Sequence, residues 1–63
     1  MNYAFYLITA DKNLRMAYHH SEIKDFDACL NDLTEAIANI RLAVGAIKLH
    51  VESDLTKRKS SPQ

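Results

Sequence analysis

The sequence predicts an all-α fold, a helix-turn-helix hairpin with a short first and a long second helix that dimerises into a four-helix bundle or coiled-coil-like assembly. The 63-residue chain has one glycine and one proline, the residues that most often interrupt helices. Its second half repeats apolar residues with spacings that alternate between four and three, the heptad pattern of packed helices. The repeat comprises Phe26, Leu30, Leu33, Ile37, Ile40, Val44, Ile47 and Val51.

The second helix is expected to begin near Ser21 and to fray near Leu55 to Lys57. Ser21 is a good N-cap residue, and acidic residues follow it, where they favour the positive end of the helix dipole. Basic residues near the other end suit the helix carbonyls. We therefore predict a single helical-hairpin domain over residues 1–57 and a disordered, polar and basic tail over residues 58–63.

The first helix is expected to run from about Asn2 to His19, because apolar and small residues again alternate by four and three. Residues 2–8 are rich in aromatic and β-branched side chains, so a strand there is the alternative. The stretch from His19 to Lys24 is the expected turn.

The two predicted helices differ in length, and this difference favours a dimer. With a turn near Ser21, Tyr3 would lie level with Asn39, and the first helix would end close to Ile40. Residues 41–55 would then have no neighbour within the chain, although the apolar repeat continues through them. A second copy would cover this half, best with the long helices antiparallel.

Small residues beside the repeat support a close approach of helices. Cys29, Ala36 and Ala43 recur every seven residues, and Gly45 marks either a tolerated glycine or a point where a partner helix crosses. The predicted dimer interface consists of Ile37, Ile40, Val44, Ile47, Val51, Leu42 and Leu49.

A second face of the first helix combines apolar and basic side chains, a mixture that is enriched at protein interfaces. It is the predicted partner-binding surface, with packing inside the dimer as the alternative. The residues are Phe5, Ile8, Lys12, Arg15, Met16 and His19.

Charge gives little support for nucleic-acid binding. Eight Lys and Arg balance eight Asp and Glu, so the chain has no overall positive field. Lys12, Arg15 and the basic residues 57–59 could still contact phosphates, which keeps an RNA-binding hairpin dimer as an alternative.

Catalytic and metal chemistry are not indicated. His19 and His20 are consecutive and point to different helix faces, and His50 stands apart, so we expect no metal site and no cofactor. Cys29 has no evident base nearby and fits a small buried residue. A chain this short has little volume for a pocket, so we expect no enzymatic activity.

The sequence has neither a basic, apolar leader at its start nor a run of roughly 20 apolar residues that would cross a membrane. A cytoplasmic protein without membrane contact is therefore expected. Together these features favour a small homodimeric regulator or adaptor that binds another protein through its helix faces. The alternatives are an RNA-binding hairpin and a purely structural oligomerisation module.

Overall fold

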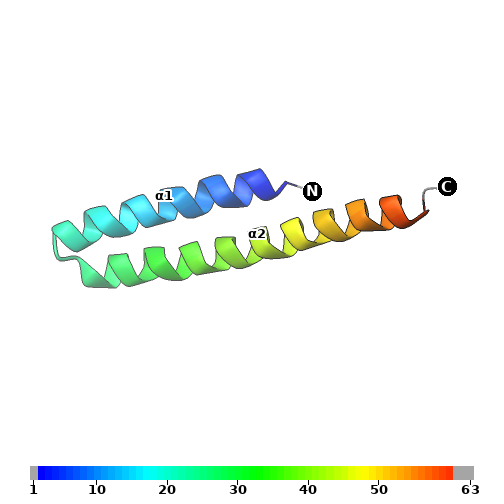
Figure 1. Ribbon diagram of the computed structural model, residues 1–63. Coiled ribbons are helices and arrows are strands. Elements are labelled where there is room, and N and C mark those ends of the chain that lie inside the picture. The colour runs from blue at the N-terminus through cyan, green and yellow to red at the C-terminus, as the bar shows by residue number, and fades with distance from the viewer. Residues whose placement is uncertain (1, 61–63) are drawn as a thin grey trace.

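The computed structural model describes the backbone of residues 2–60 and the side chains of residues 2–55. In this part of the chain two helices, α1 (Tyr3–Glu22) and α2 (Phe26–Ser60), form an antiparallel hairpin (Figure 1). No strand occurs among the described residues, so the predicted helical hairpin is confirmed and the strand alternative for residues 2–8 is wrong.

The start of α1 explains why its aromatic residues are helical. Asn2 precedes the helix, and its Oδ1 accepts a hydrogen bond of 3.1 Å from the backbone N–H of Phe5. This side-chain cap satisfies one of the N–H groups that a helix start leaves without a partner. The cap and the packing against α2 together override the strand propensity of the residues that follow.

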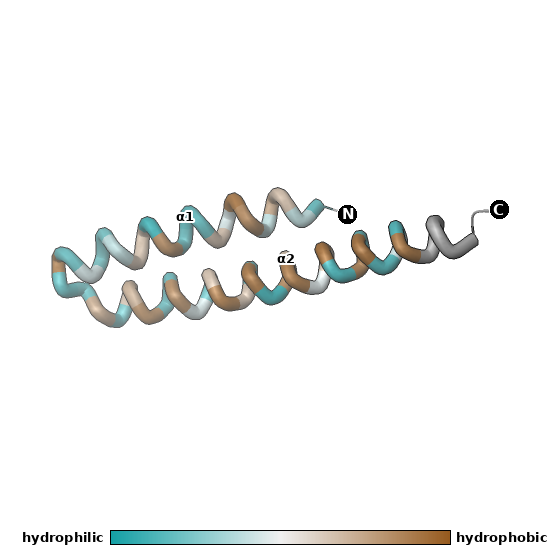
Figure 2. Tube along the Cα trace, viewed as in Figure 1, coloured by the Kyte–Doolittle hydropathy of each residue, from teal (hydrophilic) through white to brown (hydrophobic). Residues whose placement is uncertain are grey.

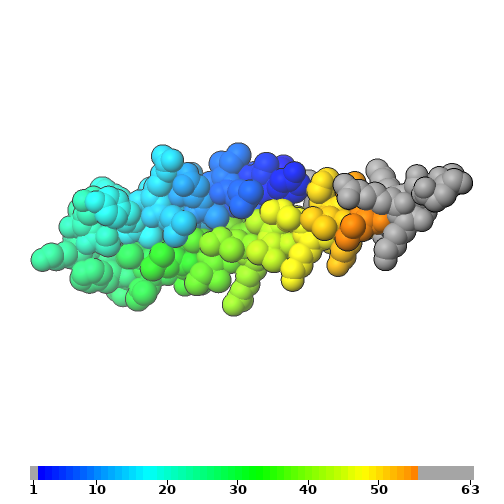
Figure 3. Space-filling view, in the orientation of Figure 1, coloured from blue at the N-terminus to red at the C-terminus, as the bar shows by residue number. Residues whose placement is uncertain are grey.

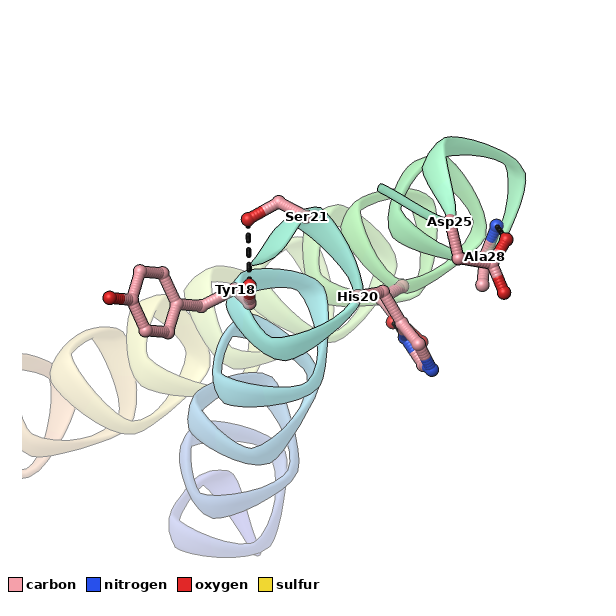
Figure 4. Close-up of polar contacts among 6 residues, drawn as sticks. Tyr18, His20, Ser21, Asp25 and Ala28 are labelled. Atoms are coloured by element: carbon pink, nitrogen blue, oxygen red, sulfur yellow. Dashed lines mark hydrogen bonds and ion pairs between the residues drawn. The ribbon is translucent and has the colours of Figure 1, made fainter. Parts of the chain in front are cut away.

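The turn lies later in the chain than predicted. The helix α1 continues to Glu22, and Ser21, the expected N-cap of the second helix, belongs to its last turn. The Ser21 hydroxyl donates to the Tyr18 carbonyl at 2.7 Å (Figure 4). Asp25 instead caps α2, because its Oδ1 accepts a 3.3 Å hydrogen bond from the N–H of Ala28.

Three residues, Ile23 to Asp25, reverse the chain. Lys24 has a φ of 61°, in the left-handed region that favours glycine. Its N–H donates to the Ser21 carbonyl at 3.1 Å, and the N–H of Asp25 donates to the His20 carbonyl at 2.9 Å. These bonds satisfy carbonyls at the end of α1 and hold Lys24 in this conformation.

The far end of α2 extends past the prediction. The helix continues to Ser60 rather than ending near Lys57. The predicted tail therefore begins within helical residues, and its remaining residues 61–63 lie outside the described part of the chain.

The register of the hairpin differs from the predicted one. The Tyr3 ring lies beside His50, with centroids 5.8 Å apart, and not level with Asn39. Ala43 and Ala46 are buried, although no intrachain neighbour was expected beyond Ile40. Because the predicted turn lay too early in the chain, each residue of α1 was expected opposite a residue of α2 that lies too close to the turn. The first helix covers α2 to about His50, so the length argument for a dimer is wrong.

The core between the helices consists of alanine side chains. No large side chain among the described residues is fully buried, and the hairpin is narrow, with Cα extents of 61 × 13 × 12 Å (Figure 3). Small side chains let the two backbones approach closely, and Ala36 and Ala43, which we expected to favour close helix packing in a dimer, are already buried within the single chain. The buried residues are Ala10, Ala17, Ala36, Ala43 and Ala46.

We expect Ala36→Leu to destabilise the protein by roughly 1–3 kcal/mol, because a larger side chain in the alanine core forces the helices apart. Ala38→Leu is the matched control, since Ala38 is exposed on the same helix. Circular dichroism during thermal unfolding measures both variants. Equal melting temperatures would show that α1 does not pack on Ala36.

Candidate interaction surfaces

The positions at which α1 and α2 meet form a seam of small and polar residues. Its members are buried, half-buried or in contact across the hairpin, and both sets follow heptad spacing. On α1 they are Tyr3, Tyr6, Ala10, Asn13, Ala17 and His20; on α2 they are Cys29, Asp32, Ala36, Asn39, Ala43, Ala46 and His50.

Two polar pairs set the register along this seam. Asn39 Nδ2 donates to Asn13 Oδ1 at 2.9 Å and to the Glu35 carbonyl at 3.1 Å. Nearer the turn, His20 Nδ1 donates to Asp32 Oδ2 at 2.6 Å, with both side chains about four-fifths shielded from solvent. A slip of the helices past each other would break both pairs and leave partly buried polar groups unsatisfied.

The large apolar residues of the predicted repeat lie outside the seam. Except for Phe26, the first residue of α2, each follows a seam position of α2 by one residue, as Ile37 follows Ala36 and Val44 follows Ala43. Successive residues of a helix are about 100° apart, so the repeat lies on a flank of α2 rather than against α1. From Phe26 to Val51 these side chains are between 37% and 62% exposed, and hydrophobic positions recur along most of the helix (Figure 2).

The first helix contributes to the same flank. Leu7, Leu14 and Tyr18 each follow a seam position of α1 by one residue, and all three are exposed. Because the helices are antiparallel, the residues that follow seam positions by one lie on the same side of the hairpin in α1 and in α2. In Figure 4 Tyr18 and Ser21 accordingly leave α1 on one side and His20, a seam residue, on another.

These residues together form one surface, which we call the apolar face. It is nearly continuous along α2, whereas on α1 the polar residues Asp11 and Ser21 occupy positions within it. Its large side chains are Leu7, Leu14 and Tyr18 of α1 with Phe26, Leu30, Leu33, Ile37, Ile40, Val44, Ile47 and Val51 of α2.

The opposite side of the hairpin carries what we call the mixed face. Its residues each precede a seam position by one, so they turn to the other side of the plane of the two helices. The face combines exposed apolar residues with polar and charged ones. Its main side chains are Phe5, Lys12, Met16 and His19 of α1 with Glu35, Leu42 and Leu49 of α2.

The structure divides both residue sets that the sequence suggested. Of the predicted dimer interface, Leu42 and Leu49 lie on the mixed face, whereas Ile37, Ile40, Val44, Ile47 and Val51 lie on the apolar face. Of the predicted partner surface, Ile8 and Arg15 lie on the back of α1, two residues from the nearest seam positions, whereas Phe5, Lys12, Met16 and His19 lie on the mixed face. The predicted heptad spacing is present in α2, but the residues that contact α1 belong to the adjacent stripe of small residues, such as Ala36 and Ala43.

Other polar groups of the hairpin lie on α1 and in the seam. Arg15 Nε forms an exposed ion pair of 3.0 Å with Asp11 Oδ2 one turn away on α1. Cys29 is a half-buried free thiol in the seam. No group of three His, Cys, Asp or Glu side chains within the described residues is placed to hold a metal ion. A Cβ added at Gly45 would meet no atom within 4 Å, so no other part of the hairpin crosses α2 closely there.

Comparison of the chain with models of known protein families, with curated proteins and with solved structures gave no significant match. Over the described residues, neither helix combines the length and the apolar character that crossing a membrane requires. The two faces are thus the features of this chain from which a function can be argued.

The Asn13–Asn39 pair can be tested by a double-mutant cycle. We expect Asn13→Ala and Asn39→Ala each to destabilise the protein, with a coupling of about 0.5–1.5 kcal/mol between them, as for a net intramolecular hydrogen bond. Chemical unfolding of the two single variants and the double variant measures this coupling. Strictly additive effects would mean that the amides do not interact.

Proposed function

We propose that this protein is a small homodimeric adaptor or regulator, in which the apolar face joins two copies and the mixed face binds another protein. The observation that carries the proposal is that the hairpin leaves most of its large apolar side chains on two separate surfaces on opposite sides of the molecule. Two surfaces allow self-association and partner binding at the same time.

Energetics support self-association through the apolar face. Complete burial of an aliphatic or aromatic side chain stabilises by about 1.5–3 kcal/mol, so covering side chains that are half exposed adds about 1 kcal/mol each. For the face as a whole this amounts to several kcal/mol per chain, comparable to the total stability of a small domain. The alanine core contributes little burial, so the hairpin depends on this additional cover.

The mixed face has the composition of a protein-binding surface. Phe5, Met16, Leu42 and Leu49 are exposed among polar neighbours, and Lys12 adds a positive charge at the edge. Aromatic residues and methionine are enriched at interfaces, and isolated apolar anchors in a polar surround are typical of associations that form and dissociate.

Protein binding is better supported than the nucleic-acid alternative. Arg15 already pairs with Asp11, and Lys12 shares its face with Glu35. Phosphate binding would require several cations on one surface and would weaken steeply with salt. An electrophoretic mobility shift at low and high salt separates the two proposals, because RNA binding of this kind would be strong only at low salt.

The role of the apolar face in dimerisation can be tested by substituting two side chains of similar size on α2, one on each face. We expect the wild-type protein to have the mass of two chains at micromolar concentration, Ile40→Asp to give one chain, and Leu42→Asp to remain a dimer. Ile40 is 43% exposed on the apolar face and Leu42 is 51% exposed on the mixed face, so the two substitutions remove similar hairpin contacts. Multi-angle light scattering measures the masses, and a dimer of Ile40→Asp would refute this role of the apolar face.

Partner binding is tested with the tagged full chain in extracts of the native host. We expect a specific protein to be retained by the wild type and by Ile8→Asp, and to be lost with Phe5→Asp while the variant stays dimeric. Ile8 is the matched control because it is an exposed apolar residue on the back of the same helix. If Phe5→Asp instead produced monomers, Phe5 would belong to the dimer and the mixed face would not be the partner surface.

A further inference from the structure

Two copies of the hairpin can cover their apolar faces in two closed, symmetric ways. A two-fold axis parallel to the helices places α2 of one copy against α1 of the other. A two-fold axis perpendicular to the helices places α2 against α2 and α1 against α1, each pair antiparallel. In both arrangements a second copy occupies the face, but the residues that meet are different.

We infer that the two copies associate about the perpendicular axis, with α2 antiparallel to α2 and the axis crossing α2 between Ala38 and Asn39. The inference rests on the homodimer of the proposed function and adds its orientation and register. Three independent features of the described residues support it: the symmetry of the apolar repeat, the position of Leu14, and the charges beside the repeat.

The apolar repeat is symmetric about this axis. Phe26 and Val51 are its first and last members and lie at equal distances from the axis, as do Leu30 and Ile47, Leu33 and Val44, and Ile37 and Ile40. Each member therefore meets an apolar side chain of the second copy, and the largest, Phe26, meets the smaller Val51. The parallel axis would instead set this continuous repeat against α1, whose share of the apolar face includes Asp11 and Ser21. That arrangement would match fewer members of the repeat with apolar side chains, because Asp11 and Ser21 interrupt the face on α1.

The register of the hairpin places Leu14 at the same axis. Asn13 is hydrogen-bonded to Asn39, so an axis that crosses α2 beside Asn39 crosses α1 beside Asn13 and Leu14. Leu14 is 46% exposed on the apolar face, and it would pack against Leu14 of the second copy. The same operation thus covers the central apolar residue of α1 as well as the repeat on α2.

Charges beside the repeat complement each other in this register. Asp27 lies at one end of the helix and Lys48 toward the other, in the same heptad position next to the apolar repeat. The perpendicular axis brings Asp27 of one copy near Lys48 of the other, and it does so twice. The same flanking positions interact with each other across antiparallel helices, so the pairing favours this orientation.

Spin labels test the orientation in the full-length protein. Labels on Lys24→Cys, in a Cys29→Ala background, should be separated by at least about 44 Å about the perpendicular axis, because 29 residues of rise separate the two sites. The parallel axis puts both labels at the same level, within about 20–25 Å, two helix diameters. Labels on Ala38→Cys are the control, since that site lies near the perpendicular axis and should give nearly the same distance in both arrangements.

The outcomes separate the inference from the function on which it rests. A long Lys24→Cys distance from a protein of two-chain mass supports the perpendicular axis. A short distance with two-chain mass overturns the inference and leaves the homodimer intact. A one-chain mass at micromolar concentration overturns both.

A charge exchange provides a second, independent measurement. We expect Asp27→Lys and Lys48→Asp each to weaken dimerisation about two- to thirtyfold at low salt, since two exposed ion pairs are lost per dimer. The double variant should regain most of the affinity, because it restores both ion pairs with the charges exchanged. This recovery should disappear at about 1 M salt, where the screening length for charges is roughly 3 Å. Single effects that simply add in the double variant would overturn the proposed register.

Discussion

The close approach of α1 and α2 along the alanine seam determines the rest of the structure. Because the buried positions are Ala10, Ala17, Ala36, Ala43 and Ala46, the two backbones pack tightly and leave no interior for large side chains. Most large apolar residues are therefore displaced to one side of the hairpin or the other, whereas Ile8 lies on the back of α1. The result is a thin, two-sided layer of helices, in which the large apolar side chains of one chain remain about half exposed.

The polar pairs give this seam the register that apolar alanines alone do not specify. Alanine methyl groups in heptad spacing would pack almost equally well after a shift by one heptad. The Asn13–Asn39 and His20–Asp32 hydrogen bonds are satisfied in one alignment only. That alignment also places Leu14 level with the centre of the apolar repeat on α2. The register within one chain therefore influences how two chains fit together.

The sequence was sufficient to predict two helices packed as a hairpin, but not their register or the residues along which they meet. The heptad spacing and the scarcity of glycine and proline predicted α2 because helix periodicity is a local property. The turn was misplaced because Ser21 and Asp25 are both good N-cap residues. The residue with the left-handed conformation is Lys24, so no glycine marked the turn in the sequence. The contact stripe was misassigned because large apolar residues are usually interior, whereas here Ala36 and Ala43 occupy the interior and Ile37 and Val44 the flank. In both cases two nearby positions were plausible for the same structural role, and a single sequence does not show which of them takes it.

The proposed function combines two kinds of binding in a short chain, and it depends on the separation of the two faces. The apolar face is long, continuous and nearly free of charge on α2, features that suit a permanent contact. The mixed face has isolated apolar anchors among polar residues, which a free dimer can expose to water without aggregating. In the inferred dimer the mixed faces of the two copies point away from each other, because each lies on the far side of its own hairpin. Each dimer would then present two equivalent, oppositely directed binding surfaces, so a partner would be bound at two sites that do not obstruct one another.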